Sequence, residues 1–205
     1  MENMTNNQVM IAGTIDSGFT FSHETFGEKF YTVYLLVERL SGASDKVHLT
    51  VSEVLIDVTQ DHKGKGIIVH GQYRSYNQHD NGKNHLILSA FAQELDFIEA
   101  ENVQVSMNDI FLDGYICKPP TYRKTPLGRE VADIMIAVNR PYGKSDYIPC
   151  ICWGRNARYV CKLPVGAHLQ LSGRIQSREY TKMLETGPVI RTAYEVSVSK
   201  IKELK

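Results

Sequence analysis

The sequence lacks the features that mark membrane proteins, secreted proteins and common enzymes. Its 205 residues contain no apolar run long enough to span a bilayer, and residues 1–7 are polar rather than signal-like. The chain has no Gly-x-Ser-x-Gly, Walker phosphate-loop or His-Glu-x-x-His motif. We therefore expect a soluble, cytoplasmic protein that is not an enzyme and needs no cofactor.

Cysteine is scarce, and histidine is scattered. The four cysteines, Cys117, Cys150, Cys152 and Cys161, all lie in the second half of the chain. The spacing Cys150-x-Cys152 is shorter than that of a zinc knuckle, and nothing indicates an oxidising compartment. We interpret the cysteines as small buried apolar residues and expect no metal site.

Net charge is absent overall, but the charges are divided unevenly. Residues 1–105 hold 7 Lys and Arg against 14 Asp and Glu, whereas residues 106–205 hold 16 against 9. A basic half next to an acidic half suggests a polyanionic partner for the basic half. Two oppositely charged surfaces that attract each other would explain the same asymmetry.

An internal repeat divides the chain near residues 100–105. At an offset of 101 residues the matches include Gly13 with Gly114, Gly27 with Gly128, Arg39 with Arg140 and Asp45 with Asp146. At an offset of 102 they include Gly71 with Gly173 and Ser75 with Ser177. This ordered series predicts two domains of similar fold, 1–104 and 105–205.

Each repeat shows the period-two alternation of half-buried strands. Ile134, Ile136 and Val138 share a phase, and Ile148, Cys150 and Cys152 follow on the next strand. A helix-like segment comes next, around Ala157–Leu163 in the second repeat and Val54–Val58 in the first. The order of three strands, a helix and two strands is typical of the oligonucleotide/oligosaccharide-binding (OB) fold. We predict an all-β protein of two tandem OB-fold five-stranded barrels, each with a short helix between its third and fourth strands. A pair of small sandwiches would not explain the helix.

In the second repeat, the residues that alternate with these core residues include aromatic and basic ones. The predicted outward residues of its third strand are Tyr147, Pro149, Ile151 and Trp153, and those of its fourth include Arg174, Gln176, Arg178 and Tyr180. Bases stack on aromatic rings and phosphates pair with arginine. The pattern predicts sequence-tolerant binding of single-stranded DNA, with RNA left open. Burial of the same rings against another subunit is the alternative.

A proline-rich loop precedes this surface, and the first repeat lacks an equivalent one. In the loop, Tyr122 stands beside Arg123 and Lys124, where the three could clamp a nucleic-acid strand; a solvated turn is the alternative. In the first repeat Lys46, His48, Thr50 and Ser52 take the places of Tyr147, Pro149, Ile151 and Trp153. We expect the first domain to serve as a scaffold or in dimerisation.

The second repeat resembles the bacterial single-stranded DNA-binding protein family. The resemblance covers most of residues 108–180, with the runs Asn108-x-Ile110-x-Leu112-x-Gly114, Ile136-Ala137-Val138-Asn139-Arg140, Asp146–Gly154 and Gly173–Tyr180. It implies that Tyr147, Trp153 and Tyr180 stack on bases, in replication, recombination or repair on the nucleoid. It also implies four barrels per assembly, which two such chains would supply as a homodimer. The family's acidic tail has no counterpart in residues 200–205, so we expect no tail-mediated recruitment of enzymes. A primosome accessory factor, with the rings in a protein interface, remains the alternative.

Overall fold

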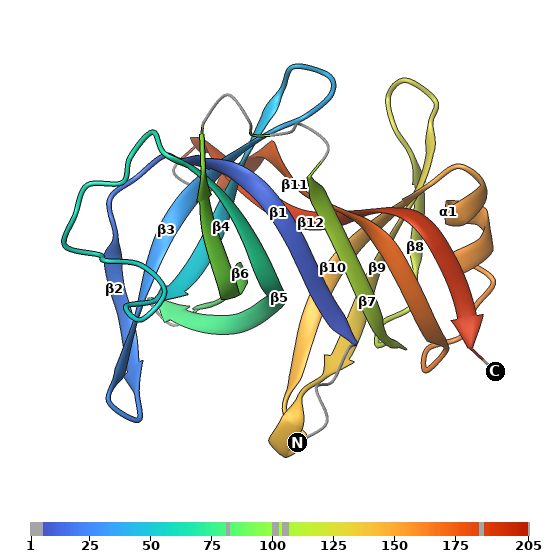
Figure 1. Cartoon of the computed structure of the whole chain (residues 1–205). Coiled ribbons are helices and arrows are strands. Elements are labelled where there is room, and N and C mark those ends of the chain that lie inside the picture. The colour runs from blue at the N-terminus through green and yellow to red at the C-terminus, as the bar shows by residue number, and fades with distance from the viewer. Residues whose placement is uncertain (1–5, 81–82, 100–102, 104–106, 185–186, 205) are drawn as a thin grey trace.

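The computed structural model of the chain is built almost wholly from strands, as the alternation predicts (Figure 1). It describes residues 6–80, 83–99, 103, 107–184 and 187–204. The first repeat forms β1 (Asn7–Ile15), β2 (Thr20–Thr25), β3 (Glu28–Glu38), β4 (Ser44–Ser52), β5 (Gly66–Asp80) and β6 (Lys83–Ile98). The second forms β7 (Asn108–Ile116), β8 (Thr121–Lys124), β9 (Glu130–Asn139), β10 (Ser145–Trp153), α1 (Arg155–Val160), β11 (His168–Leu184) and β12 (Gly187–Leu204), with a 3-10 turn at Pro141–Gly143. None of the helices in these ranges is long and apolar enough to cross a membrane.

Each repeat closes into a ring of strands. In the first, β1 pairs with both β3 and β5, while β4 joins β3 to β6 and β6 returns to β5. The second repeats this circuit with β7, β9, β10, β12 and β11. A closed ring of five strands is the arrangement of the OB fold, and the all-β class agrees with the prediction. The expected joint falls largely outside the described residues.

Two local predictions are wrong. A helix follows the third long strand only in the second repeat, where Ala157 and Val160 of α1 are fully buried. In the first repeat residues 53–65 form turns, because the carboxylate of Asp57 accepts bonds from the amide and hydroxyl of Thr59 and from Gln60. Such local bonds compete with helix formation. The proline-rich loop is also partly a strand, since β8 pairs with β9.

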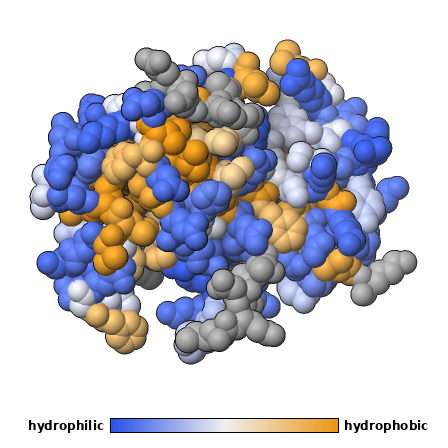
Figure 2. Space-filling model, in the orientation of Figure 1, coloured by the Kyte–Doolittle hydropathy of each residue, from blue (hydrophilic) through white to orange (hydrophobic). Residues whose placement is uncertain are grey.

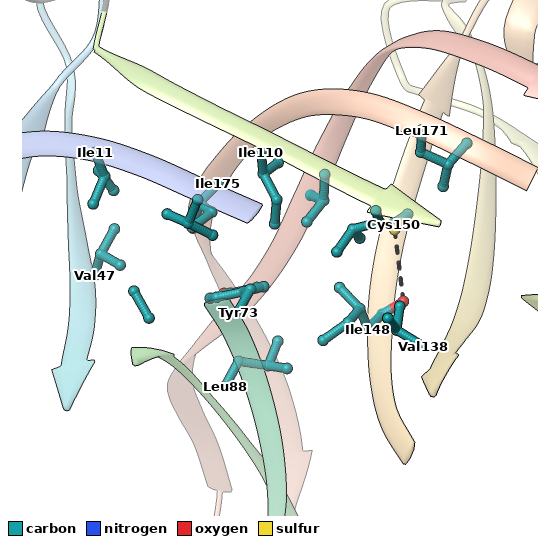
Figure 3. Packing of buried hydrophobic residues seen from close by; sticks show 14 of the residues in the cluster. Ile11, Val47, Tyr73, Leu88, Ile110, Val138, Ile148, Cys150, Leu171 and Ile175 are labelled. Atoms are coloured by element: carbon teal, nitrogen blue, oxygen red, sulfur yellow. Dashed lines mark hydrogen bonds between the residues drawn. The ribbon is translucent and has the colours of Figure 1, made fainter. Parts of the chain in front are cut away.

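The barrel interiors form one continuous apolar cluster. Side chains of the predicted core phase are buried, and those of Tyr73 and Leu88 from the first barrel pack with Ile148 of the second (Figure 3). Cys150 and Cys152 belong to this cluster as predicted, and burial raises the pKa of Cys152 to about 12. Cys117 and Cys161 are only partly buried, so the prediction is wrong for those two.

The barrels are joined by a strand pair with local two-fold symmetry. β1 and β7 run antiparallel, with Val9 opposite Ile110. Next to this pair, the side chain of Asn7 bonds both the N–H and the C=O of Tyr73, each at 2.8 Å. Asn108 bonds Ile175 in the same way, at 2.9 and 2.8 Å. Each asparagine thereby completes the hydrogen bonding of backbone that would otherwise be left unpaired.

A second reciprocal contact crosses between the barrels. The carboxylate of Asp45 accepts hydrogen bonds from the amide of Ser177 at 2.6 Å and from its hydroxyl at 2.9 Å. In return, Asp146 accepts the amide of Ser75 at 2.6 Å. These four residues are the pairs that the repeat had matched, and each aspartate binds the serine of the opposite barrel. We call this contact the aspartate–serine clasp.

The two halves of the clasp differ in electrostatics. Burial of Asp45 opposes its ionisation, but bonds from Arg39 (2.7 Å) and Ser177 outweigh that effect and hold its pKa below the usual value. Burial dominates at Asp146 and raises its pKa, although Arg140 Nε lies 3.0 Å away. The Arg140 guanidinium is poorly aligned for a hydrogen bond there. Ionised Asp45 therefore stabilises the fold more than ionised Asp146 does.

We predict that Asp45→Asn destabilises the protein by about 3 kcal/mol at pH 7, because it leaves Arg39 without its buried partner. Asp146→Asn should cost about 1 kcal/mol, because the wild-type carboxylate already bears an uncompensated burial cost. Urea unfolding measures both. Because the pKa of Asp45 is depressed, its advantage is present above its unfolded pKa, near 4, and is lost as the pH falls through the folded value. Equal losses at pH 7 would contradict the asymmetry.

Candidate nucleic-acid interface

One continuous sheet surface carries most of the predicted binding residues. It runs across β8, β9, β10, β12 and β11, which are neighbours in that order. Ile151 faces Asp133 on one side and Ser197 on the other, and Ser197 in turn faces Arg174. We call the outward side of these five strands the outer face. Arg123 and Trp153 both lie opposite Val131 in the next row of the same face.

Trp153 stands at one end of the outer face in a basic hollow. Its side chain is 36% exposed, outside the barrel interior. The indole Nε1–H donates to Ser197 Oγ at 3.2 Å, which restrains one edge of the ring. Basic groups of Lys124, Arg129 and Arg158 line the same hollow, together with Glu130. Arg158 is paired with Glu130 at 3.0 Å.

A groove of about 980 Å³ forms the other end of the outer face, between the barrels. The second barrel lines it with Pro149, Arg178 and Tyr180, and Tyr180 is 39% exposed. His48, Gln78 and His85 of the first barrel are among the residues opposite. Tyr147, at the start of β10, is 47% exposed. Its amide donates to Ser75 Oγ at 2.8 Å, so the clasp fixes the backbone of this tyrosine.

The arginines of the outer face differ in their partners. Arg123 is bonded to Asp133, which raises the pKa of its guanidinium, and Arg178 lies 3.4 Å from Glu195. Arg174 donates to the neutral amide oxygen of Gln176 at 3.2 Å. A phosphate can approach Arg174 without displacing a carboxylate from it, which makes this residue the readiest of the three for an anion.

Three expectations about the predicted binding residues need correction. Ile151 is on the outer face but only 3% exposed, since strands β9 and β12 flank it on both sides. Gln176 is likewise buried, with its amide bonded to Glu195 at 2.9 Å. Tyr122 lies apart from Arg123: its hydroxyl donates to Glu130 at 2.7 Å, and its ring lines a separate hollow beside α1. Alternation along β8 separates these adjacent residues, while Lys124, at the strand end, reaches the hollow of Trp153.

The first barrel carries aromatic rings that the comparison of the two repeats did not predict. His23 stacks on Phe30 at 4.9 Å between ring centroids, and Phe30 lies 5.5 Å from Phe91. The guanidinium of Arg74 sits 3.5 Å above Phe91. In the view of Figure 2, apolar residues gather over the side of the molecule that the first barrel occupies in Figure 1. These rings come from β2, β3 and β6, whereas the comparison had considered β4 and β5.

Other residues around the outer face also escaped prediction. They are Lys118 and Arg191 at the groove, Arg129 at the hollow of Trp153, and Ser197, which bonds the indole. A basic residue directly after the Gly128 turn was a usable signal for Arg129. Ser197 and Arg191 become visible only through the pairing register of β11 and β12, which alternation alone does not supply.

The fold and this surface define an OB-fold protein with an aromatic and basic sheet face. Residues 107–204, the carboxyl-terminal barrel, match the model of the single-strand binding protein family. The single-stranded DNA-binding protein 3 of Listeria innocua is 37% identical over 81 residues, covering 36% of this chain and 51% of that protein. Single-stranded DNA-binding protein A of Bacillus subtilis is 36% identical over 81 residues, covering 36% of this chain and 47% of that protein. The chain thus spans about half the length of these curated relatives.

The whole chain has a counterpart in a solved fold. The crystal structure of the single-stranded DNA binding protein from Thermus aquaticus superposes with a TM-score of 0.73 at 19% identity. The match covers 97% of this chain and 93% of that one. The similarity extends over both barrels, including the first, which lies outside the family match.

We predict that Ser197→Ala loosens the indole of Trp153 without unfolding the barrel, since a single exposed neutral hydrogen bond is worth about 1 kcal/mol or less. Trp153 is the only tryptophan, so its fluorescence reports on this site alone. Acrylamide should quench the variant more readily than wild type. Ser199→Ala is the matched control, because Ser199 Oγ bonds the carbonyl of Ser172 instead. Identical quenching of the two variants would argue against the restraint.

Proposed function

We propose that this protein binds single-stranded DNA on the outer face of its second barrel, without catalysis and with little sequence preference. The observation that carries the proposal is Trp153: an exposed indole, restrained through Nε1, in a hollow with Lys124, Arg129 and Arg158. A ring next to cations offers a base a stacking surface and its phosphate a counter-charge. Every base has a π-face, so such a surface does not select sequence.

The proposed path runs along β10. Tyr147 and Trp153 lie six residues apart on this strand, or about 20 Å at the rise of a β-strand. Tyr180 and Arg178 flank the path in the groove, and Arg174 and Arg123 lie on strands to either side of β10. A path of this length suits the site sizes of about 4–16 nucleotides that OB folds use.

We assign different roles to the two barrels. The proposed boundary lies at 104/105, with the basic second barrel as binding domain. The acidic first barrel acts as scaffold, since its Ser75 holds the amide of Tyr147 and its Asp45 holds Ser177 next to Arg178. This role belongs in replication, recombination or repair, on DNA of the nucleoid. RNA can use the same stacking surface, so competition by oligo-dT and oligo-U ranks the two.

Oligo-dT should bind and quench Trp153 fluorescence, with log K falling as log salt rises, by about 0.7 per neutralised phosphate. Each base stack is worth about 1–3 kcal/mol, so Tyr147→Ala and Trp153→Ala should each weaken binding roughly 5- to 150-fold. Fluorescence anisotropy of labelled oligo-dT measures both variants. Tyr115→Ala is the matched control, since Tyr115 is 40% exposed on β7 and stacks on His168 instead. Unchanged affinity of the Tyr147 and Trp153 variants would refute the site.

We also infer that two chains associate into a homodimer with four barrels. Support comes from the surface where β1 and β7 pair. Around the local two-fold axis, the side chains of Met10 and Phe111 line a shared hollow with Gln8, His70 and Lys200. A surface that is itself two-fold symmetric suits an isologous contact between copies.

Light scattering should therefore give twice the chain mass of 23.2 kDa. Phe111→Glu should shift the protein toward monomer, because it replaces an apolar ring at the proposed contact by a charge that the contact would bury. Phe21→Glu, at an exposed ring on β2, serves as control and should leave the mass unchanged. A monomeric wild type at micromolar concentration would exclude the homodimer.

A further inference from the structure

A carboxylate lies on the proposed DNA path between its two aromatic ends. Asp133 on β9 faces Thr121 on β8 and Ile151 on β10. Its side chain is 40% exposed, and it lines the groove that contains Tyr180. A strand of DNA that follows β10 from Tyr147 to Trp153 passes Ile151 and therefore passes close to this negative charge on the neighbouring strand.

Asp133 binds the guanidinium of Arg123, the group that a phosphate of the DNA would bind. Arg123 Nε is 2.7 Å from Asp133 Oδ2, and a terminal nitrogen of Arg123 is 3.1 Å from Oδ1. This two-point geometry is also the one by which arginine binds phosphate. The Arg123 side chain is 39% exposed, so both partners are open to solvent and to a ligand.

Glu195, the other carboxylate held by an arginine of this face, is placed differently. Its side chain is only 7% exposed beneath Arg178, and it also accepts a bond from the buried amide of Gln176. Both acids line the groove, but Asp133 exposes far more of its side chain to a ligand than Glu195 does. The two acids therefore act at different depths, and Asp133 is the one in direct competition with phosphate.

We propose that Asp133 is a built-in competitor of the DNA backbone, which holds Arg123 in the free protein and yields it when a phosphate arrives. The proposal rests on the proposed function. Asp133 then limits the affinity for DNA. Arg123 must lose its bonds to the carboxylate before it can bind a phosphate, which offsets part of its attraction to DNA. The carboxylate itself also repels the phosphate. An intramolecular competitor of this kind keeps binding reversible and moderates its dependence on salt.

The test is Asp133→Asn, which keeps the shape of the side chain and removes its charge. Oligo-dT should bind this variant about three- to tenfold more tightly than wild type, because Arg123 no longer has to leave a carboxylate to meet a phosphate. Its log K should fall more steeply with log salt, by about 0.7, as Arg123 gains a full phosphate contact. In the double variant with Arg123→Ala, most of this gain should disappear, because the residue for which Asp133 competes is absent.

Asp113→Asn is the matched control for net charge. Asp113 is on β7, which is not one of the five strands of the outer face, and its carboxylate is held by His168 and Gln170 at the start of β11. It should leave affinity unchanged, and an equal gain would overturn the proposal in favour of a net-charge effect. Asp133→Asn binding no tighter than wild type, while wild type binds oligo-dT and is quenched, would overturn the competitor role and leave the proposed function standing. Absence of any binding by wild type would overturn both.

Discussion

The geometry of the outer face depends on the aspartate–serine clasp between the barrels. Ser75 of the first barrel joins Asp146 to the amide of Tyr147, at the start of β10. Asp45 of the first barrel holds Ser177, which stands between Gln176 and Arg178 on β11. Both strands that bear the principal aromatic and basic residues are therefore positioned by the opposite barrel. Since charge-assisted bonds to a buried carboxylate are among the stronger hydrogen bonds, this coupling is expected to be stiff.

The sequence predicted the equivalence of these residues but not their contact. The repeat matched Asp45 with Asp146 and Ser75 with Ser177, because both barrels use the same device. A repeat reports which residues play the same part, and it cannot say that the aspartate of one copy meets the serine of the other. The change of offset from 101 to 102 was also informative. It places one additional residue in the second repeat between Asp146 and Gly166, the stretch where only that repeat forms a helix.

The outer face was predictable to the extent that alternation governs it. Period two placed Tyr147, Trp153, Arg174 and Arg178 on one side of the sheet, and the structure agrees. Alternation assumes that an outward side chain is an exposed one, which fails at Ile151 because neighbouring strands flank it. It also says nothing about side-chain partners, so the ion pair of Arg123 with Asp133 could not be foreseen. The rings of the first barrel were missed for a related reason, since they occupy strands that the aligned positions did not include.

The hydrogen bond that restrains Trp153 depends on a glycine, Gly173. Gly173 lies at a bulge in the pairing of β11 with β12, and a Cβ atom there would be 2.2 Å from the carbonyl oxygen of Ser197. Gly71 has the same relation to Phe91 in the first barrel, at 2.0 Å. The repeat therefore keeps glycine where two strands must approach closely to curl into a barrel. In the second barrel this close approach fixes the backbone of Ser197, whose hydroxyl then meets the indole from β10. Barrel closure and the orientation of the proposed stacking ring are thus set by the same contact, so a larger residue at 173 would disturb both together.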